Sequence, residues 1–364
     1  MTNRGSRVGV IVAIVALTLP IIALGVVFTG IVTSPAATTA AADAFSSDSS
    51  GEQAAAQPEE VSDNPLAGVS FYVDPTSLAA TAAAESAAAD PGSTAGATST
   101  ASPSSTTAKL EKLAAQPTAI WLTPEKYPTA SIAATVTSIL DDAQSKGSMP
   151  VFVVYGVPNR DCGNFSVGGL TAADYPLWVA QIASAVTARQ AVVILEPDAL
   201  ALSGQCGNAD ERIAEVKGAV DTFASTKAVV YLDGGHSTWL PANQMADLLN
   251  RAGIAKARGF VSNVSNYNST VKERAYGEKL SKLTGNSHYV IDTGRNGKGS
   301  TGEWCNPSGR ALGATSSAIT NAGHLDAQLW VKPPGESDGT CNGGPAAGVW
   351  WPQSALELAT NAGW

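Results

Sequence analysis

Along the chain from residue 110 onward, short runs of apolar and β-branched residues alternate with longer amphipathic stretches. The apolar runs are 118–122, 150–155, 191–196, 228–232, 259–263, 288–292 and 326–331. The helix-like stretches between most of them are 132–144, 172–188, 210–223, 244–251 and 271–283. Strands that are apolar at consecutive positions are buried on both faces of a sheet. Strands that alternate with helices form βαβ units, so the pattern predicts an α/β protein with a parallel sheet.

This number of units in one chain of 364 residues favours a single TIM-like β/α barrel. An open, doubly wound parallel sheet is the alternative. No glycine-rich phosphate fingerprint follows the first predicted strand, which weakens that alternative.

A long apolar segment lies near the start of the chain. It covers residues 8–32 and follows Arg4 and Arg7. The segment is longer than the roughly 7–15 residues of a secretory h-region and reaches the roughly 20 residues that span a membrane. We expect residues 1–34 to be either a cleaved signal peptide or a transmembrane anchor. The arginines keep the N-terminus cytoplasmic, so both alternatives export the rest of the chain.

Two tracts are rich in Ala, Ser and Thr. Residues 35–64 contain almost no large apolar side chains and are predicted to be a flexible linker. Residues 69–73 are predicted to form a strand. The second tract, at about 76–107, then interrupts the folded region and is interpreted as a surface loop, in which 78–89 is a candidate helix. The folded domain is expected to cover 65–364.

Composition narrows the function. The net charge is −9, from 22 Lys and Arg against 31 Asp and Glu, which argues against nucleic acid as a partner. The three histidines have no close metal-binding spacing, so no metal is predicted. Neither a GxSxG elbow nor a Walker motif occurs, and no cofactor is predicted. Eight Trp against seven Phe suggest flat aromatic contact surfaces.

Acidic residues follow four of the predicted strands, and they are Asp161, Asp198, Asp233 and Asp338. One acid at such a position is usually a turn residue or a helix N-cap. Four acids that converge on the carboxyl ends of parallel strands would repel one another and raise some pKa values. Such an arrangement suits acid/base chemistry, and paired carboxylates cleave glycosidic bonds.

Three tryptophans lie at or just past predicted strand ends, and they are Trp121, Trp239 and Trp304. Each one alone is as readily explained by core packing. As a set beside the acids, they favour sugar binding, because a tryptophan face stacks on the apolar face of a pyranose ring.

With these residues in view, the sequence resembles glycoside hydrolase family 6, the inverting cellulases. The resemblance covers residues 66–364 and rests on seven motifs in the same order: 153–162, 193–200, 231–239, 263–267, 291–297, 303–306 and 330–339. It implies a distorted β/α barrel with an active-site cleft or tunnel at the carboxyl ends of the strands.

The resemblance also implies roles for individual residues. Asp198 matches the general acid, Asp161 the neighbouring carboxylate that raises the pKa of the acid, and Tyr155 the tyrosine beneath the distorted sugar ring. Asp338 matches the proposed base, whose identity is disputed in the family; the alternative is a water held by Ser166. The positions that match sugar-binding residues are Trp121, Thr123, Asp233, His236, Trp239, Asn266, Trp304, Lys332 and Glu336.

The resemblance further implies two disulfides, Cys162–Cys206 and Cys305–Cys341, whereas free thiols are the alternative. The implied function is a monomeric β-1,4-glucanase that hydrolyses cellulose or a related β-glucan with inversion. Short segments at 203–210 and 332–348 favour an open cleft and endo-action over a cellobiohydrolase. A non-catalytic, cell-surface glucan-binding protein is the alternative from another class.

Overall fold

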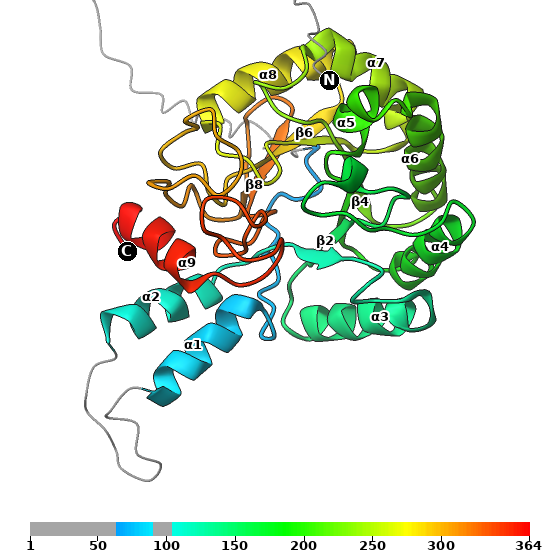
Figure 1. The fold of residues 1–364 in the computed structure, drawn as a ribbon. Coiled ribbons are helices and arrows are strands. Elements are labelled where there is room, and N and C mark those ends of the chain that lie inside the picture. The colour runs from blue at the N-terminus through cyan, green and yellow to red at the C-terminus, as the bar shows by residue number, and fades with distance from the viewer. Residues whose placement is uncertain (1–62, 90–103) are drawn as a thin grey trace, which may run out of the picture. The chain divides into compact units, whose positions relative to one another are not determined.

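The predicted strands assemble into one eight-stranded sheet in the computed structural model, which describes residues 63–89 and 104–364 (Figure 1). The strand order is β1-β2-β3-β4-β5-β6-β8-β7. All neighbours are parallel except β7, which pairs antiparallel with β8. The strands are β1 (Ile120–Leu122), β2 (Val151–Val154), β3 (Val192–Leu195), β4 (Val229–Asp233), β5 (Gly259–Ser262), β6 (His288–Asp292), β7 (Ser317–Ala318) and β8 (Leu325–Leu329).

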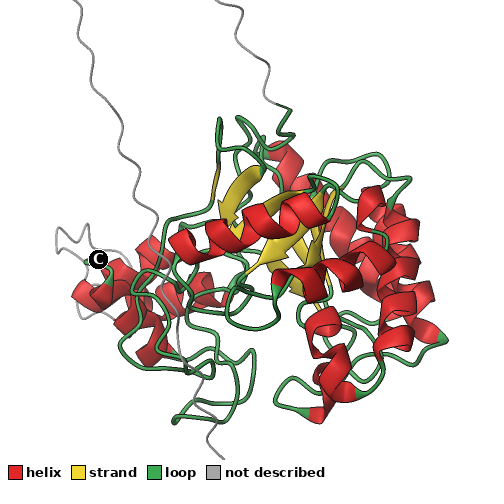
Figure 2. Ribbon diagram, turned by 90° about the horizontal axis from the view of Figure 1, so that it is seen from above, coloured by secondary structure: helices red, strands yellow, loops and turns green. Residues whose placement is uncertain are grey.

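Helices surround the sheet, which lies in the interior (Figures 1 and 2). They are α1 (Leu78–Ala89), α2 (Ser105–Ala114), α3 (Thr129–Ser145), α4 (Asp174–Val186), α5 (Ala199–Cys206), α6 (Ala209–Phe223), α7 (Ala242–Arg251), α8 (Thr270–Leu283) and α9 (Pro352–Asn361). Two short 3₁₀ helices, η1 (Asp161–Gly163) and η2 (Ile254–Lys256), lie in connecting loops.

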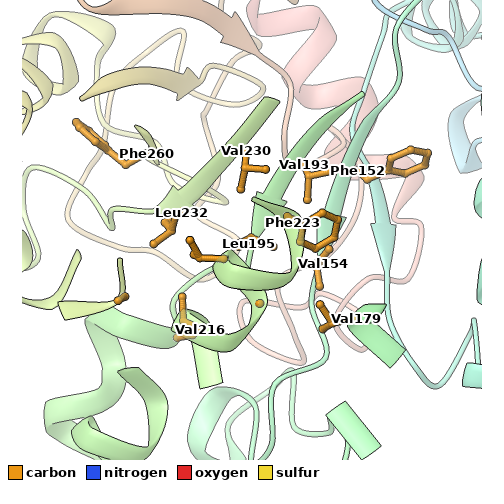
Figure 3. Close-up of a cluster of buried hydrophobic side chains, with 14 of the residues drawn as sticks. Phe152, Val154, Val179, Val193, Leu195, Val216, Phe223, Val230, Leu232 and Phe260 are labelled. Atoms are coloured by element: carbon orange, nitrogen blue, oxygen red, sulfur yellow. The ribbon is translucent and has the colours of Figure 1, made fainter. Parts of the chain in front are cut away.

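The strands bury both of their faces. In β2 and β3 every residue is buried. Alternate residues such as Val154 and Leu195 pack outward with Val179 and Phe223 of the helices (Figure 3), while the residues between them belong to a second cluster of buried side chains. Because side chains alternate between the two faces of a strand, this two-sided burial explains the uninterrupted apolar runs in the sequence.

The sheet is an incompletely closed barrel. Among the described residues, β1 and β8 have no strand pairing. The main-chain N–H of Ala119 instead donates to the carbonyl of Trp330 at 2.9 Å, and the indole N–H of Trp121 donates to the carbonyl of Val331 at 2.8 Å. The predicted parallel β/α barrel is therefore confirmed, in a distorted form with an open seam between β1 and β8.

Several local predictions need correction. Residues 69–73 form no strand; only a bridge between Phe71 and Met149 is present there. The helix over 78–89 is confirmed as α1. The second helix, α2, begins at Ser105, inside the tract interpreted as a loop, and it buries Leu110 and Leu113. The rest of that tract, 90–103, lies outside the described residues.

The start of the described region is fixed to the sheet. The side-chain amide of Asn64 donates to the main-chain oxygens of Asp326 at 2.7 Å and Ile319 at 2.9 Å. The predicted signal or anchor segment and nearly all of the predicted linker lie outside the described residues. Within 63–89 and 104–364, no helix is long and apolar enough to cross a membrane.

Candidate active site

The chain makes a strained turn directly after β3. Glu196 and Asp198 have positive φ angles of 49° and 68°, a region that non-glycine residues seldom adopt. Asp198 occupies the N-cap position of α5, yet its side chain makes no capping hydrogen bond. The usual reason for an aspartate at a helix start is therefore missing, and the backbone strain marks this turn as a functional candidate.

Asp233, at the end of β4, lies directly behind this turn. Its carboxyl oxygen Oδ2 accepts hydrogen bonds from the main-chain N–H groups of Asp198 and Gly235, both at 3.1 Å. The other oxygen, Oδ1, is buried and has no partner among the described residues. Asp233 is only 2% exposed, and burial raises its pKa to about 7. The sequence predicts a sugar contact for Asp233, whereas here its carboxyl supports the backbone of Asp198.

The pKa of Asp198 is raised well above the usual aspartate range. Burial is the main cause, and the negative charges of Asp233, Asp161 and Asp338 add to it. Lys332 opposes the shift. A carboxyl group with a raised pKa keeps its proton near neutral pH and can donate it. The four acids thus converge as predicted, and they favour protonated Asp198.

The loop after β2 carries Asp161. Asp161 and Cys162 are consecutive residues with positive φ angles of 58° and 49°. The Asp161 carboxylate accepts a hydrogen bond from the main-chain N–H of Ser166 at 2.8 Å. Cys162 forms a disulfide with Cys206, the last residue of α5. This bridge joins the loop of Asp161 to the helix that follows Asp198.

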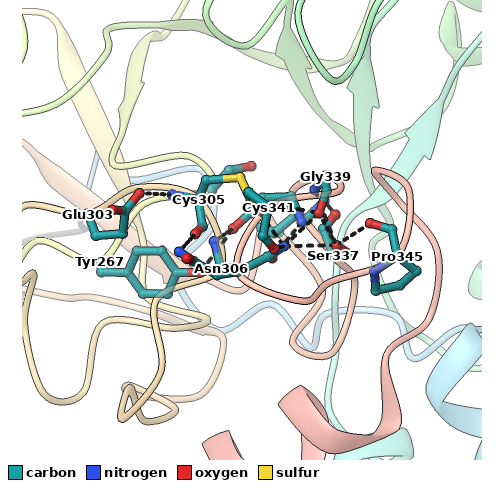
Figure 4. The surroundings of a disulfide bond; sticks show 12 residues. Tyr267, Glu303, Cys305, Asn306, Ser337, Gly339, Cys341 and Pro345 are labelled. Carbon is teal, nitrogen blue, oxygen red and sulfur yellow. Dashed lines mark hydrogen bonds between the residues drawn. A yellow bond between two sulfur atoms is a disulfide. The ribbon is translucent and has the colours of Figure 1, made fainter.

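Both predicted disulfides are present. The second, Cys305–Cys341, joins the segment after β6 to the loop after β8 (Figure 4). Asn306 stabilises the same junction, because its side-chain amide donates to the carbonyl of Gly339 at 2.8 Å and to the hydroxyl of Ser337 at 3.1 Å. The segment that contains Asp338 is therefore held from several directions.

Tyr155 lies at the end of β2 and is nearly buried. Its ring contacts the ring of Trp121 edge-on, with centroids 5.0 Å apart. The guanidinium of Arg160 lies 4.6 Å from the Tyr155 ring centre and forms an ion pair of 3.1 Å with Glu125. Burial, with the charges of Asp198 and Asp161, raises the pKa of Tyr155 well above 10. Its hydroxyl therefore stays protonated.

The Asp338 carboxylate is contacted by polar groups at both of its oxygens. Arg295 contacts both of its oxygens, at 2.9 and 3.0 Å. The Tyr267 hydroxyl donates to Oδ2 at 3.1 Å, and the main-chain N–H of Asn306 donates to it at 3.0 Å. Burial alone would raise the pKa of Asp338, but Arg295 and Lys332 outweigh burial and lower it. A lowered pKa means a weak base, which disfavours the proton-acceptor role that sequence suggests.

A cavity of about 470 Å³ opens at the seam between β1 and β8. It is lined by four of the predicted sugar-binding residues, Trp121, Thr123, Lys332 and Glu336, and by Tyr155 and Ser166. The ammonium of Lys332 lies 5.6 Å from the Trp121 ring centre and 3.8 Å from the Glu336 carboxylate. An aromatic face beside charged hydrogen-bonding groups suits a sugar ring and its hydroxyls.

The remaining predicted sugar-binding residues do not line this cavity. The rings of His236 and Trp239 lie 5.4 Å apart after β4, and burial lowers the pKa of His236 to about 4, so it is neutral. Asn266 is partly buried after β5. Trp304 is 52% exposed. The structure thus divides the predicted sugar contacts into a cavity group and a group at other strand ends.

Two buried acids stabilise the site without any role predicted from sequence. Glu196 accepts hydrogen bonds from the main-chain N–H groups of Gly156 and Val157, each at 3.1 Å. Burial raises the pKa of Glu196 to about 7. Asp292 receives four main-chain N–H groups, those of Ser265, Gly294, Val331 and Lys332. Both acids stand at predicted strand ends, but all of their partners except Gly294 are distant in sequence.

Arg295 and Tyr267 were also not predicted as site residues. Both lie within the quoted motifs, yet only the fold brings them to Asp338. Within residues 63–89 and 104–364, no group of His, Cys, Asp and Glu side chains is arranged to hold a metal ion.

Comparisons with known proteins agree with this geometry. Endoglucanase A of Cellulomonas fimi is 46% identical over 71% of this chain and 57% of its own length. Endoglucanase A of Thermobispora bispora is 41% identical over 85% and 65%, and endoglucanase 1 of Streptomyces halstedii is 37% identical over 84% and 93%. The chain thus spans less than two thirds of the length of the first two relatives.

Among solved structures, the endoglucanase Cel6 from Mycobacterium tuberculosis, in complex with methyl-cellobiosyl-4-deoxy-4-thio-β-D-cellobioside, is similar with a TM-score of 0.75 and 45% identity. The match covers 83% of this chain and 100% of that chain. Residues 70–362 also match the family described as glycosyl hydrolases family 6. On this match, and with the convergent acids at the ends of a distorted β/α barrel, the chain belongs to glycosyl hydrolases family 6.

Proposed function

We propose that the domain hydrolyses β-1,4-glucosidic bonds of cellulose or a related β-glucan, at internal positions and with inversion. One observation carries the proposal: the raised pKa of Asp198, whose carboxyl stands among three further acids, Asp161 after β2, Asp233 at the end of β4 and Asp338 after β8. A protonated carboxylic acid at the site of cleavage is what a glycosidic oxygen needs in order to leave. Family membership supports the same chemistry.

In the proposed mechanism, Asp198 donates its proton to the leaving oxygen. Asp161 keeps the pKa of Asp198 high beforehand, and its carboxylate then stabilises the positive charge that develops on the sugar ring. Tyr155, protonated and nearly buried, forms the base of the site beneath the reacting ring. The cavity group of Trp121, Thr123, Lys332 and Glu336 binds the glucan on one side of the scissile bond.

The attacking water needs a proton acceptor. Asp338 accepts hydrogen bonds from Arg295, Tyr267 and Asn306, and its lowered pKa makes it a weak base. Ser166 is bound through its main-chain N–H to Asp161. A water held by the Ser166 hydroxyl would lie close to that carboxylate. We therefore favour the route through Ser166 and regard Asp338 as a fixed anion.

The names of the more similar relatives support endo-action. The relatives named endoglucanases are 37–46% identical to this chain, whereas those named cellobiohydrolases are 30–31% identical. A reducing-sugar assay on carboxymethylcellulose, run beside a viscosity measurement, tests the proposal. We expect viscosity to fall early, because internal cuts shorten the polymer quickly. Reducing ends without a fall in viscosity would indicate exo-action. Binding without any reducing ends would indicate a glucan-binding protein instead.

We also propose that the domain acts outside the cytoplasm as a monomer. The two disulfides support export, because disulfides persist in oxidising compartments. The apolar residues 8–32 would then be a removed signal peptide or a retained anchor. Mass measurement on protein recovered from expressing cells distinguishes the two, since cleavage removes the segment and an anchor leaves it in the membrane fraction. Protein found only in the cytosol would contradict export.

A further inference from the structure

Phe165 connects the loop after β2 to the segments after β6 and β8. It belongs to the loop after β2, between Asp161 and the return of that loop at Gly168. Its ring centre lies 6.0 Å from that of Trp304. The ring also rests on Gly339, where the position that a Cβ atom would occupy is only 2.5 Å from Cγ of Phe165. The contact therefore requires glycine at position 339.

Both residues that Phe165 contacts are held by the second disulfide. Trp304 precedes Cys305, and Gly339 lies two residues before Cys341. Figure 4 shows Gly339 beside this bridge. Phe165 thus packs against a surface that is itself fixed, and that surface follows directly on Asp338.

The other side of the contact is a loop held by short-range hydrogen bonds, such as those from the main-chain N–H groups of Asn164 and Ser166 to Asp161. The disulfide at Cys162 fixes one end, and Arg160 fixes the other end by hydrogen bonds to the carbonyls of Ser166 and Gly168 at 2.9 and 3.1 Å. Between these points the loop is short of regular structure, and Val167 is 63% exposed. The Phe165 side chain connects this part of the loop to Trp304 and Gly339.

We propose that Phe165 is a positioning residue, whose contact with Gly339 and Trp304 fixes the loop of Asp161 against the segment of Asp338. Phe165 also lines the cavity and is 44% exposed. The proposed effect acts through Asp161, and the experiment distinguishes it from a contact with the sugar. The proposal rests on the proposed function, because it assumes that the position of Asp161 relative to Asp198 controls hydrolysis.

The effect on chemistry follows from the charges around Asp198. Asp233, Asp161 and Asp338 raise the pKa of Asp198, and Lys332 lowers it. If the loop moves away, Asp161 contributes less, so the pKa of Asp198 falls. The alkaline limb of the activity profile, where the acid loses its proton, then moves to lower pH.

The experiment compares Phe165→Ala, Phe165→Leu and a control, Asn164→Ala, at an exposed position of the same loop that does not line the cavity. kcat and KM on carboxymethylcellulose are measured across pH, and hydrogen exchange is followed in a peptide that covers 161–169. For Phe165→Ala we expect a fall in kcat of about 10- to 100-fold, because small misplacements cost rate heavily. We also expect an alkaline limb at lower pH and faster exchange. Phe165→Leu should recover most of these losses, and Asn164→Ala should behave as the parent protein.

Three outcomes would overturn the inference. Phe165→Ala could keep the kcat and pH profile of the parent, or Asn164→Ala could lose as much as Phe165→Ala. A change confined to KM, with parental exchange, would make Phe165 a sugar contact instead. If the parent protein hydrolyses no β-glucan, the proposed function fails first. Hydrogen exchange then still decides, independently of activity, whether the ring fixes the loop.

Discussion

The main-chain N–H of Asp198 donates a hydrogen bond of 3.1 Å to Oδ2 of Asp233. This bond connects the turns after two neighbouring strands and stabilises the left-handed backbone of Asp198. It also brings two carboxyl groups together in a buried place, so that the negative charge of Asp233 raises the pKa of Asp198. The contact therefore positions the proposed acid, and the charge of Asp233 adds to the burial that keeps the acid protonated.

Because Asp233 binds the backbone of Asp198, the Asp198→Asn variant should keep this contact and fold normally. We expect it to lose most activity on cellulose-like substrates, since an amide cannot donate the proton that a poor leaving group needs. Cellobiosyl fluoride, whose leaving group needs little protonation, should be cleaved far better. Asp247→Asn, on the exposed part of α7, is the control. Equal losses on both substrates would refute the assignment of Asp198.

Stability should fall as pH rises from about 4.5 to about 7. In the folded protein, burial raises the pKa of Glu196 from its ordinary value of 4.5 to about 7. Between these values the folded state binds more protons than the unfolded state, so stability is highest below the lower value. The loss is on the order of 1–3 kcal/mol. Urea unfolding at pH 5 and 7.5 measures it.

The matched variants for this test are Glu196→Gln and the exposed Glu111→Gln. The first should flatten the pH dependence, although other buried acids such as Asp233 leave part of it in place. The second should leave the dependence as in the parent. A parental slope in Glu196→Gln would show that Glu196 titrates alike in the folded and unfolded states.

Removal of one partner of the buried ion pair between Arg295 and Asp338 should be costly. We expect Arg295→Ala to reduce the free energy of unfolding by about 3–5 kcal/mol, because it leaves a buried charge unpaired. Arg295→Ala combined with Asp338→Asn should cost less than the two single changes together. For comparison, Lys217→Ala, which breaks an exposed pair with Asp221, should cost at most about 1 kcal/mol. Strict additivity of Arg295→Ala and Asp338→Asn would contradict the coupling.

Reduction of the disulfides should lower activity before it unfolds the barrel. Cys162 adjoins Asp161, and Cys341 lies three residues after Asp338, whereas the core strands are independent of both bridges. Activity, near-UV circular dichroism and the number of free thiols by mass spectrometry are followed while reductant is titrated. Four free thiols before any reductant is added, or unfolding and inactivation at the same reductant concentration, would contradict this prediction.

Hydrolysis should invert the anomeric carbon. In the proposed route no carboxylate bonds to the sugar, and the water attacks the anomeric carbon from the side opposite the leaving oxygen. The first product from a β-linked glucan should therefore be the α-anomer. A proton NMR time course that starts on addition of enzyme measures this. If the β-anomer forms first, the mechanism proposed for Asp198 is wrong.

The barrel was predictable from the sequence because a strand buried on both faces appears as a run of consecutive apolar residues. Val192–Leu195 is apolar throughout, and both of its faces are covered. The predicted strand at 69–73 failed because Phe71 and Tyr72 are buried in a segment with only one bridge. The missed helix α2 did carry a local signal, since Ser104 accepts a capping hydrogen bond from Thr107, but its Ser/Thr-rich surroundings resemble a linker.

The site was predictable only in part. Strand-end positions predicted that the four acids would converge, and residue types suggested their chemistry. Which acid is buried behind another, and which is neutralised, depends on partners far along the chain. Arg295 and Asp338 are 43 residues apart, and Asp233 reaches the backbone of Asp198 across 35 residues. Such pairings arise only when neighbouring strands pair in the sheet, so residue spacing gives no indication of them.

The open seam between β1 and β8 has a consequence for how a polymer can reach the acids. A complete ladder of hydrogen bonds there would leave no gap between the two strands. Instead, one main-chain hydrogen bond joins Ala119 to Trp330, and residues from both sides of this gap line the cavity. Under the proposed function, an internal segment of a glucan could then enter the cavity from the side of the barrel, without threading a chain end.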